Sequence, residues 1–162
     1  MPTYYLHLGS NQGDRKKNIQ FALENIQKKI GVIINQSSIY ETEAWGLEDQ
    51  PHFLNMALAI ETNEKPLQLM AITKEIEKET GRTPSEKWGP RVLDIDILYA
   101  ENLVLQTDTL TIPHAGIYDR NFVLIPLIEI AGDFIDPVKQ ISIDELYDIC
   151  TDKREVYLYE EE

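Results

Sequence analysis

The sequence predicts an α/β sandwich of the α+β class, because strand-like and helix-like segments alternate in the order β-α-β-β-α-β from the N-terminus to Ile97. That order is the split β-α-β arrangement of a ferredoxin-like sandwich. An added hairpin and C-terminal helices are expected after it. A length of 162 residues favours one domain with a substantial core. We therefore expect a single domain over residues 1–159 and a disordered acidic tail over residues 160–162.

The first half of the pattern is a strand, a helix and a second strand. Tyr4–Leu8 is predicted as a short aromatic strand that Gly9–Asn11 closes. Asp14 suits the N-cap of a helix that Gly31 stops. The apolar positions of this helix follow the 3.6-residue period: Ile19, Ala22, Leu23, Ile26 and Ile30. Val32–Tyr40 is predicted as the second strand.

The second half of the pattern begins with a strand over Phe53–Thr62. One face of this strand carries Leu54, Met56, Leu58 and Ile60, and the other carries Phe53, Asn55, Ala57 and Ala59. Pro66 suits the first turn of a helix that Gly81 stops. The ten-residue connection Gly81–Pro90 has no periodicity and is longer than usual, so it is predicted as a lid.

Shorter elements are expected after Ile97. Leu103–Leu105 and Leu110–Ile112 suit a hairpin, and Phe122–Ala131 suits a short helix interrupted by Pro126. Ser142 with Glu145 forms a capping box for a last helix to about Cys150. Val156–Tyr159 is expected to return as an edge strand.

The charge balance excludes some partners. Acidic residues outnumber basic ones by 28 to 15, for a formal charge of −13, so nucleic acids and anionic membranes are repelled. The one cysteine, Cys150, fits a reducing compartment. No signal peptide or transmembrane helix is expected, because Met1–Tyr5 has no basic residue and the longest apolar run contains Pro126. A cytoplasmic location follows as the expectation. The sequence does not decide the oligomeric state, and a monomer is compatible with it.

Two aspartates mark the most informative stretch of the chain, Trp88–Ile97. Asp94 and Asp96 alternate with apolar residues, so both carboxylates point from one face of a strand, with Cα atoms about 6–7 Å apart. Like charges at that distance repel, and one or two divalent cations would remove the repulsion. Arg91 precedes the pair and suits a phosphate. The alternative is an ordinary solvated strand, because this spacing of aspartates is common.

The segment from Met70 to Arg91 is nearly neutral, with five basic and four acidic residues. An anionic ligand would meet little repulsion there. The alternative for its helical part, up to Glu79, is a solvent-exposed face with ion pairs four residues apart. That alternative does not cover Arg82 or Arg91, which lie beyond the helix.

Phe53 and Asn55 share a strand face with two small alanines, which leaves a slot with an aromatic wall and an amide. A flat heterocycle would suit it, and so would the close approach of a helix. Three other residues can be explained without a function. Trp88 could pack in the core, His114 could lie in a surface loop, and Arg120 could form a surface ion pair with Asp119.

These stretches resemble the 6-hydroxymethyl-7,8-dihydropterin pyrophosphokinases of folate biosynthesis, over about Tyr5 to Pro137. The segments that carry the resemblance are Leu8–Asp14, Gln50–Asn55, Lys87–Asp96, Leu110–His114 and Arg120–Leu127. The resemblance implies transfer of pyrophosphate from the co-substrate ATP to the hydroxymethyl group of the reduced pterin, with release of AMP. It also implies two Mg²⁺ ions held by Asp94 and Asp96.

The resemblance further implies roles for individual residues. The catalytic ones would be Arg82, Arg91, Asp94 and Asp96. Those on the ATP side would be Glu77, Arg82, Trp88, Arg91, Ile97, Thr109, Thr111, His114, Tyr118 and Arg120. Those on the pterin side would be Thr42, Glu43, Ala44, Trp45, Phe53, Asn55, Asp94 and Phe122. Because Arg82 lies on the predicted lid, ATP is expected to bind before the pterin.

The chain departs from the family pattern at several positions. The loop from Gly81 to Trp88 is one residue shorter than in the family, and Pro84 stands where a second loop arginine often occurs. Trp45 replaces a smaller aliphatic residue, Phe53 replaces a tyrosine, and Thr109 stands where a basic residue can occur.

Two other function classes remain open. A ligand-binding ferredoxin-like module without catalysis would bind pterin or nucleotide and give no product. An RNA-binding domain would need a basic sheet face with stacking aromatic residues, which the charge of −13 opposes.

Overall fold

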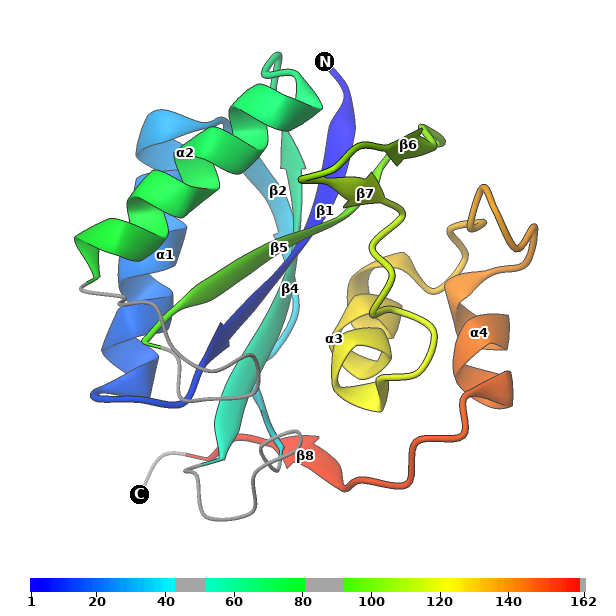
Figure 1. The fold of residues 1–162 in the computed structure, drawn as a ribbon. Helices are drawn as coiled ribbons and strands as arrows, with labels where there is room; N and C mark the ends of the chain where they lie inside the picture. Colours follow the sequence, from blue (N-terminus) through cyan, green and yellow to red (C-terminus); the bar gives the residue numbers. More distant parts are fainter. Residues whose placement is uncertain (43–51, 81–91, 161–162) are drawn as a thin grey trace.

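The computed structural model describes residues 1–42, 52–80 and 92–160, and its centre is an antiparallel sheet (Figure 1). The strands follow the order β5-β1-β4-β3-β8, and β2 also pairs with β4. Their bounds are Thr3–Ser10 for β1, Val32–Gln36 for β2, Tyr40–Thr42 for β3, Phe53–Glu61 for β4, Asp94–Ala100 for β5 and Val156–Leu158 for β8. The strand β5 therefore lies beside β1, although most of the preceding chain separates the two in sequence.

Helices cover both faces of this sheet. Helices α1 (Arg15–Lys29) and α2 (Pro66–Glu79) pack on one face, and α3 (Asn121–Ala131) and α4 (Ile143–Ile149) lie on the other (Figure 1). An antiparallel sheet with four helices in the described part of the chain confirms the predicted α+β class. No helix in the described ranges is long and apolar enough to cross a membrane.

The predicted helix ends agree with the structure where a side chain caps them. The Asp14 carboxylate accepts a hydrogen bond from the Lys17 backbone N–H at 3.2 Å. Ser142 and Glu145 form the expected capping box at α4, and Pro66 is the first residue of α2. At the end of α1, a Cβ on Gly31 would lie 2.2 Å from the Glu61 carbonyl oxygen. Only glycine therefore allows the chain to pass so close to β4.

The structure corrects the predicted strand over 32–40, which forms two strands, β2 and β3. Ser37 lies between them, and its hydroxyl accepts a hydrogen bond from the Ala57 N–H at 2.9 Å. A side chain thus replaces a backbone carbonyl in the ladder, and this interrupts the pairing with β4.

The second correction concerns the helix over 122–131, which begins at Asn121 and continues through Pro126 without interruption. Proline lacks the N–H that would bond the carbonyl of Phe122, four residues earlier. The apolar side chains Val123, Leu124 and Leu127 are buried, and their packing holds the helix together across this missing bond. The added hairpin is confirmed with shorter strands, β6 (Leu105–Gln106) and β7 (Thr111–Ile112).

The sheet separates two hydrophobic cores. The first, under α1 and α2, contains Leu54, Met56, Leu58 and Ile60, as the alternation in β4 predicts. The second, under α3 and α4, contains Ala57 from the other face of β4. The register of β1 and β5 shifts at Leu98, so that Leu98 and Tyr99 both enter the second core.

Candidate functional site

Strand register brings the two predicted halves of the site together on one face of the sheet. Gly9 of β1 pairs with Asp94 of β5 on one side and with Asn55 of β4 on the other. Residues paired across antiparallel strands point from the same face, so the three positions form one row. The aspartate pair and the aromatic-amide slot are therefore separated only by the width of β1.

The next row along the same face contains Asp96, His7 and Ala57. His7 is 4% exposed, and its ring lies 6.0 Å, between centroids, from the Phe122 ring at the start of α3. Burial lowers the pKa of His7 to about 4, against the opposing effects of Asp96 and of hydrogen bonding to the Phe122 backbone. The imidazole is therefore neutral at physiological pH.

Helix α2 fixes the segment of β5 that carries the aspartates. The buried Glu77 accepts a hydrogen bond from the Ile95 backbone N–H, with 2.7 Å between Oε2 and N. Ile95 lies between Asp94 and Asp96, so this bond restrains both. The resemblance placed Glu77 near the nucleotide, and the structure shows one of its carboxylate oxygens bonded to the strand.

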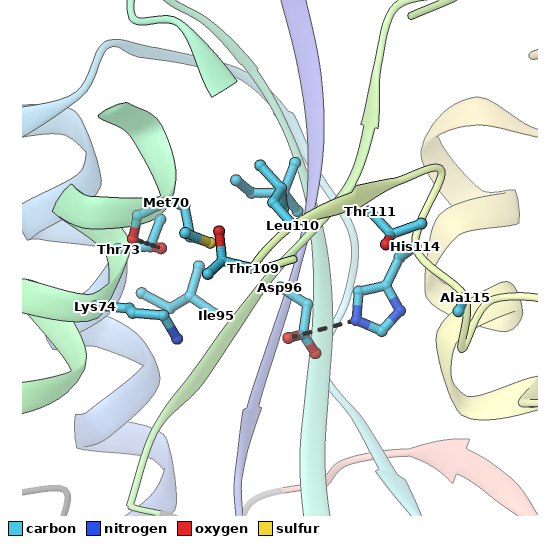
Figure 2. Close-up of a pocket in the computed structure, with 11 residues that line it drawn as sticks. Met70, Thr73, Lys74, Ile95, Asp96, Thr109, Leu110, Thr111, His114 and Ala115 are labelled. Carbon is cyan, nitrogen blue, oxygen red and sulfur yellow. Dashed lines mark hydrogen bonds and ion pairs between the residues drawn. The ribbon is translucent and has the colours of Figure 1, made fainter. Parts of the chain in front are cut away.

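His114 is held beside Asp96 by two backbone groups. Its own N–H donates to the Leu98 carbonyl at 3.0 Å, and its Nδ1 accepts from the Gly116 N–H at 2.9 Å. Because Nδ1 is an acceptor, the neutral ring carries its proton on Nε2. That nitrogen lies 3.8 Å from Asp96 Oδ1 (Figure 2).

Arg120 lies close to His114 because Gly116 has no side chain. A Cβ on Gly116 would lie 2.8 Å from Arg120 Nη1 and 3.2 Å from His114 Cε1. The guanidinium also packs 5.9 Å from the centre of the Phe122 ring. Two groups predicted to contact phosphate therefore lie close to each other, and one of them, His114, lies next to Asp96.

A cavity of about 290 Å³ opens between α2, β5 and the hairpin (Figure 2). Its volume is near the lower end of the range of about 300–1,000 Å³ for small-molecule sites. Five predicted residues line it, Asp96, Ile97, Thr109, Thr111 and His114. The remaining lining residues are Met70, Thr73, Lys74, Ile95, Leu110 and Ala115. The sequence analysis missed Met70, Thr73 and Lys74, and their spacing of three and four residues on α2 is the signal that could have found them.

The space above Gly9 is the centre of the predicted pterin slot. A Cβ there would lie 3.7 Å from Asn55 Oδ1, 3.7 Å from Phe53 Cδ1 and 3.8 Å from His7 Cε1. The side chain of Asn55 is buried, and its Nδ2 has no hydrogen-bond partner in the described ranges. The aromatic ring and the amide that the sequence analysis combined thus approach one point above Gly9.

Tyr118, predicted near the nucleotide, is not among the residues that line the cavity between α2, β5 and the hairpin. Its ring packs against the second core. Its hydroxyl donates to Asp136 Oδ2 at 2.9 Å, because the buried Asp136 carboxylate needs hydrogen-bond donors. Thr42 is buried on β3, where its hydroxyl donates to the Glu155 carbonyl at 3.1 Å. Several predicted site residues lie outside the described residues: Glu43, Ala44, Trp45, Arg82, Trp88 and Arg91.

The donor set suits a metal that is shared with a substrate. Residues 1–42, 52–80 and 92–160 contain no group of three or more side chains that could hold a metal ion. Asp94 and Asp96 offer hard carboxylate oxygens from one face, and Asp96 is 43% exposed. Magnesium binds through one or two carboxylates plus substrate phosphates, so this pair fits it.

Comparison with known proteins decides the family. The profile of the 7,8-dihydro-6-hydroxymethylpterin-pyrophosphokinase (HPPK) family matches residues 5–132. The chain belongs to this family. Pyrophosphokinase activity in folate biosynthesis, expected from the sequence motifs, is thereby confirmed for the enzyme.

Relatives of similar length support this assignment. The 2-amino-4-hydroxy-6-hydroxymethyldihydropteridine pyrophosphokinase of Aquifex aeolicus is 41% identical over 90% of both chains. The protein of the same description from Bacillus subtilis is 45% identical over 78% of this chain and 76% of its own.

The fold also matches solved structures. A Plasmodium falciparum HPPK-DHPS structure superposes with a TM-score of 0.74 at 17% identity. The match covers 91% of this pyrophosphokinase but only 43% of that longer chain, and it supports the fold alone.

Proposed function

We propose that the enzyme transfers pyrophosphate from ATP to the hydroxymethyl group of 6-hydroxymethyl-7,8-dihydropterin and releases AMP. The observation that carries this proposal is the row Asp94–Gly9–Asn55, which sets a carboxylate pair near the buried Asn55 amide, whose Nδ2 has no hydrogen-bond partner among the described residues. A phosphate-binding edge and a heterocycle slot on one sheet face would hold two substrates next to each other.

The cavity between α2 and the hairpin is the proposed nucleotide site. Ile97, Thr109 and Thr111 line it and would contact the adenosine. His114 lines it beside Asp96, Arg120 approaches His114, and both would contact the triphosphate. Arg82, Trp88 and Arg91 would complete this side. Tyr118 or its neighbours would lie near the nucleotide, with the Tyr118 hydroxyl bonded to Asp136.

The pterin would occupy the space above Gly9. Phe53 and Phe122 would stack on its rings, and Asn55 Nδ2 would donate to its amide edge. Backbone groups of Thr42, Glu43 and Ala44, with the Trp45 side chain, would close the pocket.

Asp94 and Asp96 would hold two Mg²⁺ ions together with ATP. The bound ions would supply positive charge to a crowded polyphosphate, which is what such a transfer requires. The protein contributes position: holding two reactants in line is equivalent to an effective concentration of about 10⁵ M or more. In the transfer, the bond from the hydroxymethyl oxygen to the β-phosphorus forms and the bond from that phosphorus to the AMP oxygen breaks. The hydroxyl proton is lost to solvent.

Other properties stay proposals from the sequence. The strand order β5-β1-β4-β2 supports the ferredoxin-like class. We also propose a single domain over residues 1–159, a monomeric state and a cytoplasmic location. ATP would bind before the pterin.

Substitution of the aspartates tests the proposed site. Asp94→Ala and Asp96→Ala are expected to lower AMP release with Mg²⁺ and both substrates by at least a hundredfold. Asp133→Ala, an exposed carboxylate beyond α3, is the matched control and is expected to keep wild-type activity. Unchanged turnover in both site variants would contradict the assignment of the metal site.

A further inference from the structure

His7 is a buried polar side chain next to Gly9, and none of the family motifs of the sequence includes it. It lies between Asp96 and Ala57 in the second row of the site, one row from Gly9. Its Nε2 is buried and has no hydrogen-bond partner in the described part of the chain. A buried polar atom without a partner is costly, so the position calls for a physical reason.

The ring is oriented toward the space above Gly9. Its Cε1 lies 3.8 Å from the point where a Gly9 Cβ would lie, the same point that Asn55 Oδ1 and Phe53 Cδ1 approach at 3.7 Å. Nε2 is bonded to Cε1 and is therefore near this space. Two buried side-chain nitrogens without partners among the described residues thus belong to side chains, His7 and Asn55, that converge on one point above Gly9.

The other contacts of the ring decide its chemical character. Hydrogen bonding to the Phe122 backbone raises the pKa of His7, which is the effect of a carbonyl that accepts from a ring N–H, and the Phe122 carbonyl is the one that Pro126 leaves without its helical N–H. Since Nε2 has no partner, Nδ1 is the donor, and Nε2 presents a lone pair. It can therefore accept a hydrogen bond from an N–H or O–H group.

We propose that His7 is a further pterin-binding residue, whose Nε2 accepts a hydrogen bond from an N–H or O–H group of the reduced pterin above Gly9. This inference rests on the proposed function, because it takes the slot as the pterin site. His7 would allow a pocket with aromatic walls to distinguish ligands that carry a hydrogen-bond donor at that edge from ligands that do not. A ligand that lacks a donor at that edge would leave Nε2 buried and unpaired.

Two substitutions separate binding from structure. His7→Leu fills a similar volume with an apolar side chain and removes the hydrogen-bond acceptor. His7→Gln introduces an amide oxygen that can accept in its place. His7→Leu is expected to weaken binding of the reduced pterin about tenfold, and His7→Gln about threefold or less. Both are expected to leave ATP affinity within twofold. The melting temperature of the unliganded His7→Leu protein is expected to stay equal or rise, because an unpaired polar atom is removed.

Calorimetric titration with the reduced pterin, in the presence of Mg²⁺ and α,β-methylene-ATP, measures the affinity without turnover, because the bond to be broken is replaced. Gln20→Ala, at an exposed position of α1 outside the predicted site, is the control. Wild-type pterin affinity in folded His7→Leu would overturn the proposal. Equal losses for both ligands, or a loss that His7→Gln does not restore, would show a structural role and overturn it too.

The proposed function fails separately, if the wild-type enzyme releases no AMP. Pterin titration of the wild-type and His7→Leu proteins decides the role of His7 in that case as well, because it does not depend on turnover.

Discussion

Glu77 of α2 accepts a hydrogen bond from the backbone N–H of Ile95, with 2.7 Å between Oε2 and N. This bond joins α2, which lines the cavity beside the hairpin, to the point of β5 between the two aspartates. The side chain is 4% exposed, so water cannot replace it as an acceptor. The separation of the two carboxylates therefore depends on a helix outside the aspartate motif.

Glu77→Ala is expected to lower both stability and metal affinity. The Ile95 N–H would lose its acceptor, which costs about 1–3 kcal/mol in the free energy of unfolding. The looser strand would raise the Mg²⁺ concentration for half-maximal activity several-fold. Urea unfolding and Mg²⁺ titration measure the two effects. Glu77→Gln keeps an acceptor oxygen and is expected to lose less of both. Glu75→Ala, an exposed neighbour, is the control, and equal behaviour of Glu77→Ala and Glu75→Ala would contradict this role.

Gly116→Ala is expected to impair nucleotide binding more than folding. The new Cβ would lie 2.8 Å from Arg120 Nη1, so the flexible end of that side chain must move away from His114. Because the clash is with a side-chain end and not with backbone, the free energy of unfolding should change by less than about 1 kcal/mol. The KM for ATP should rise about five- to tenfold, equivalent to about 1–1.4 kcal/mol, while the pterin KM stays near its wild-type value. Steady-state kinetics with each substrate varied in turn checks this, and an unchanged KM for ATP would show that Arg120 does not act on the triphosphate.

His7 is expected to make the folded protein sensitive to acid. Burial lowers its pKa from 6.5 to about 4, while Asp96, His114 and Arg120 face the ring and act on it electrostatically. Between these two pH values the unfolded chain binds a proton that the folded protein excludes. The free energy of unfolding therefore decreases as the pH falls from about 6.5 to about 4, by about 3 kcal/mol for this group, and His7 has no such effect above pH 7.

The comparison of wild type with His7→Leu isolates this contribution. Urea unfolding at several pH values, without Mg²⁺ or nucleotide, should show the variant becoming more stable relative to wild type as the pH falls. Parallel stability profiles of the two proteins would contradict the buried, neutral state of His7.

Local patterns explain why parts of this structure could be predicted from the sequence. The Asp14 cap and the faces of β4 depend on residues a few positions apart, and the structure confirms them. The break at Ser37 could not be predicted, because it depends on a hydrogen bond with Ala57, twenty positions away. The continuous helix through Pro126 depends likewise on the packing of its apolar face.

The site shows the same division. Asp94 and Asp96 are recognisable from their alternation, and Asn55 from its strand face. Their meeting across Gly9 depends on the register of three strands that are distant in sequence. His7 carried a signal that the sequence analysis did not use: a histidine alternating with Leu6 and Leu8 lies on the same strand face as Gly9.

The identity of the nucleotide product tests the central claim most directly. Phosphorus NMR of the wild-type enzyme with ATP, Mg²⁺ and 6-hydroxymethyl-7,8-dihydropterin should show AMP and a pterin diphosphate appearing in equal amounts. Formation of ADP with a pterin monophosphate, or binding of both substrates without any product, would contradict the transfer of pyrophosphate at this site.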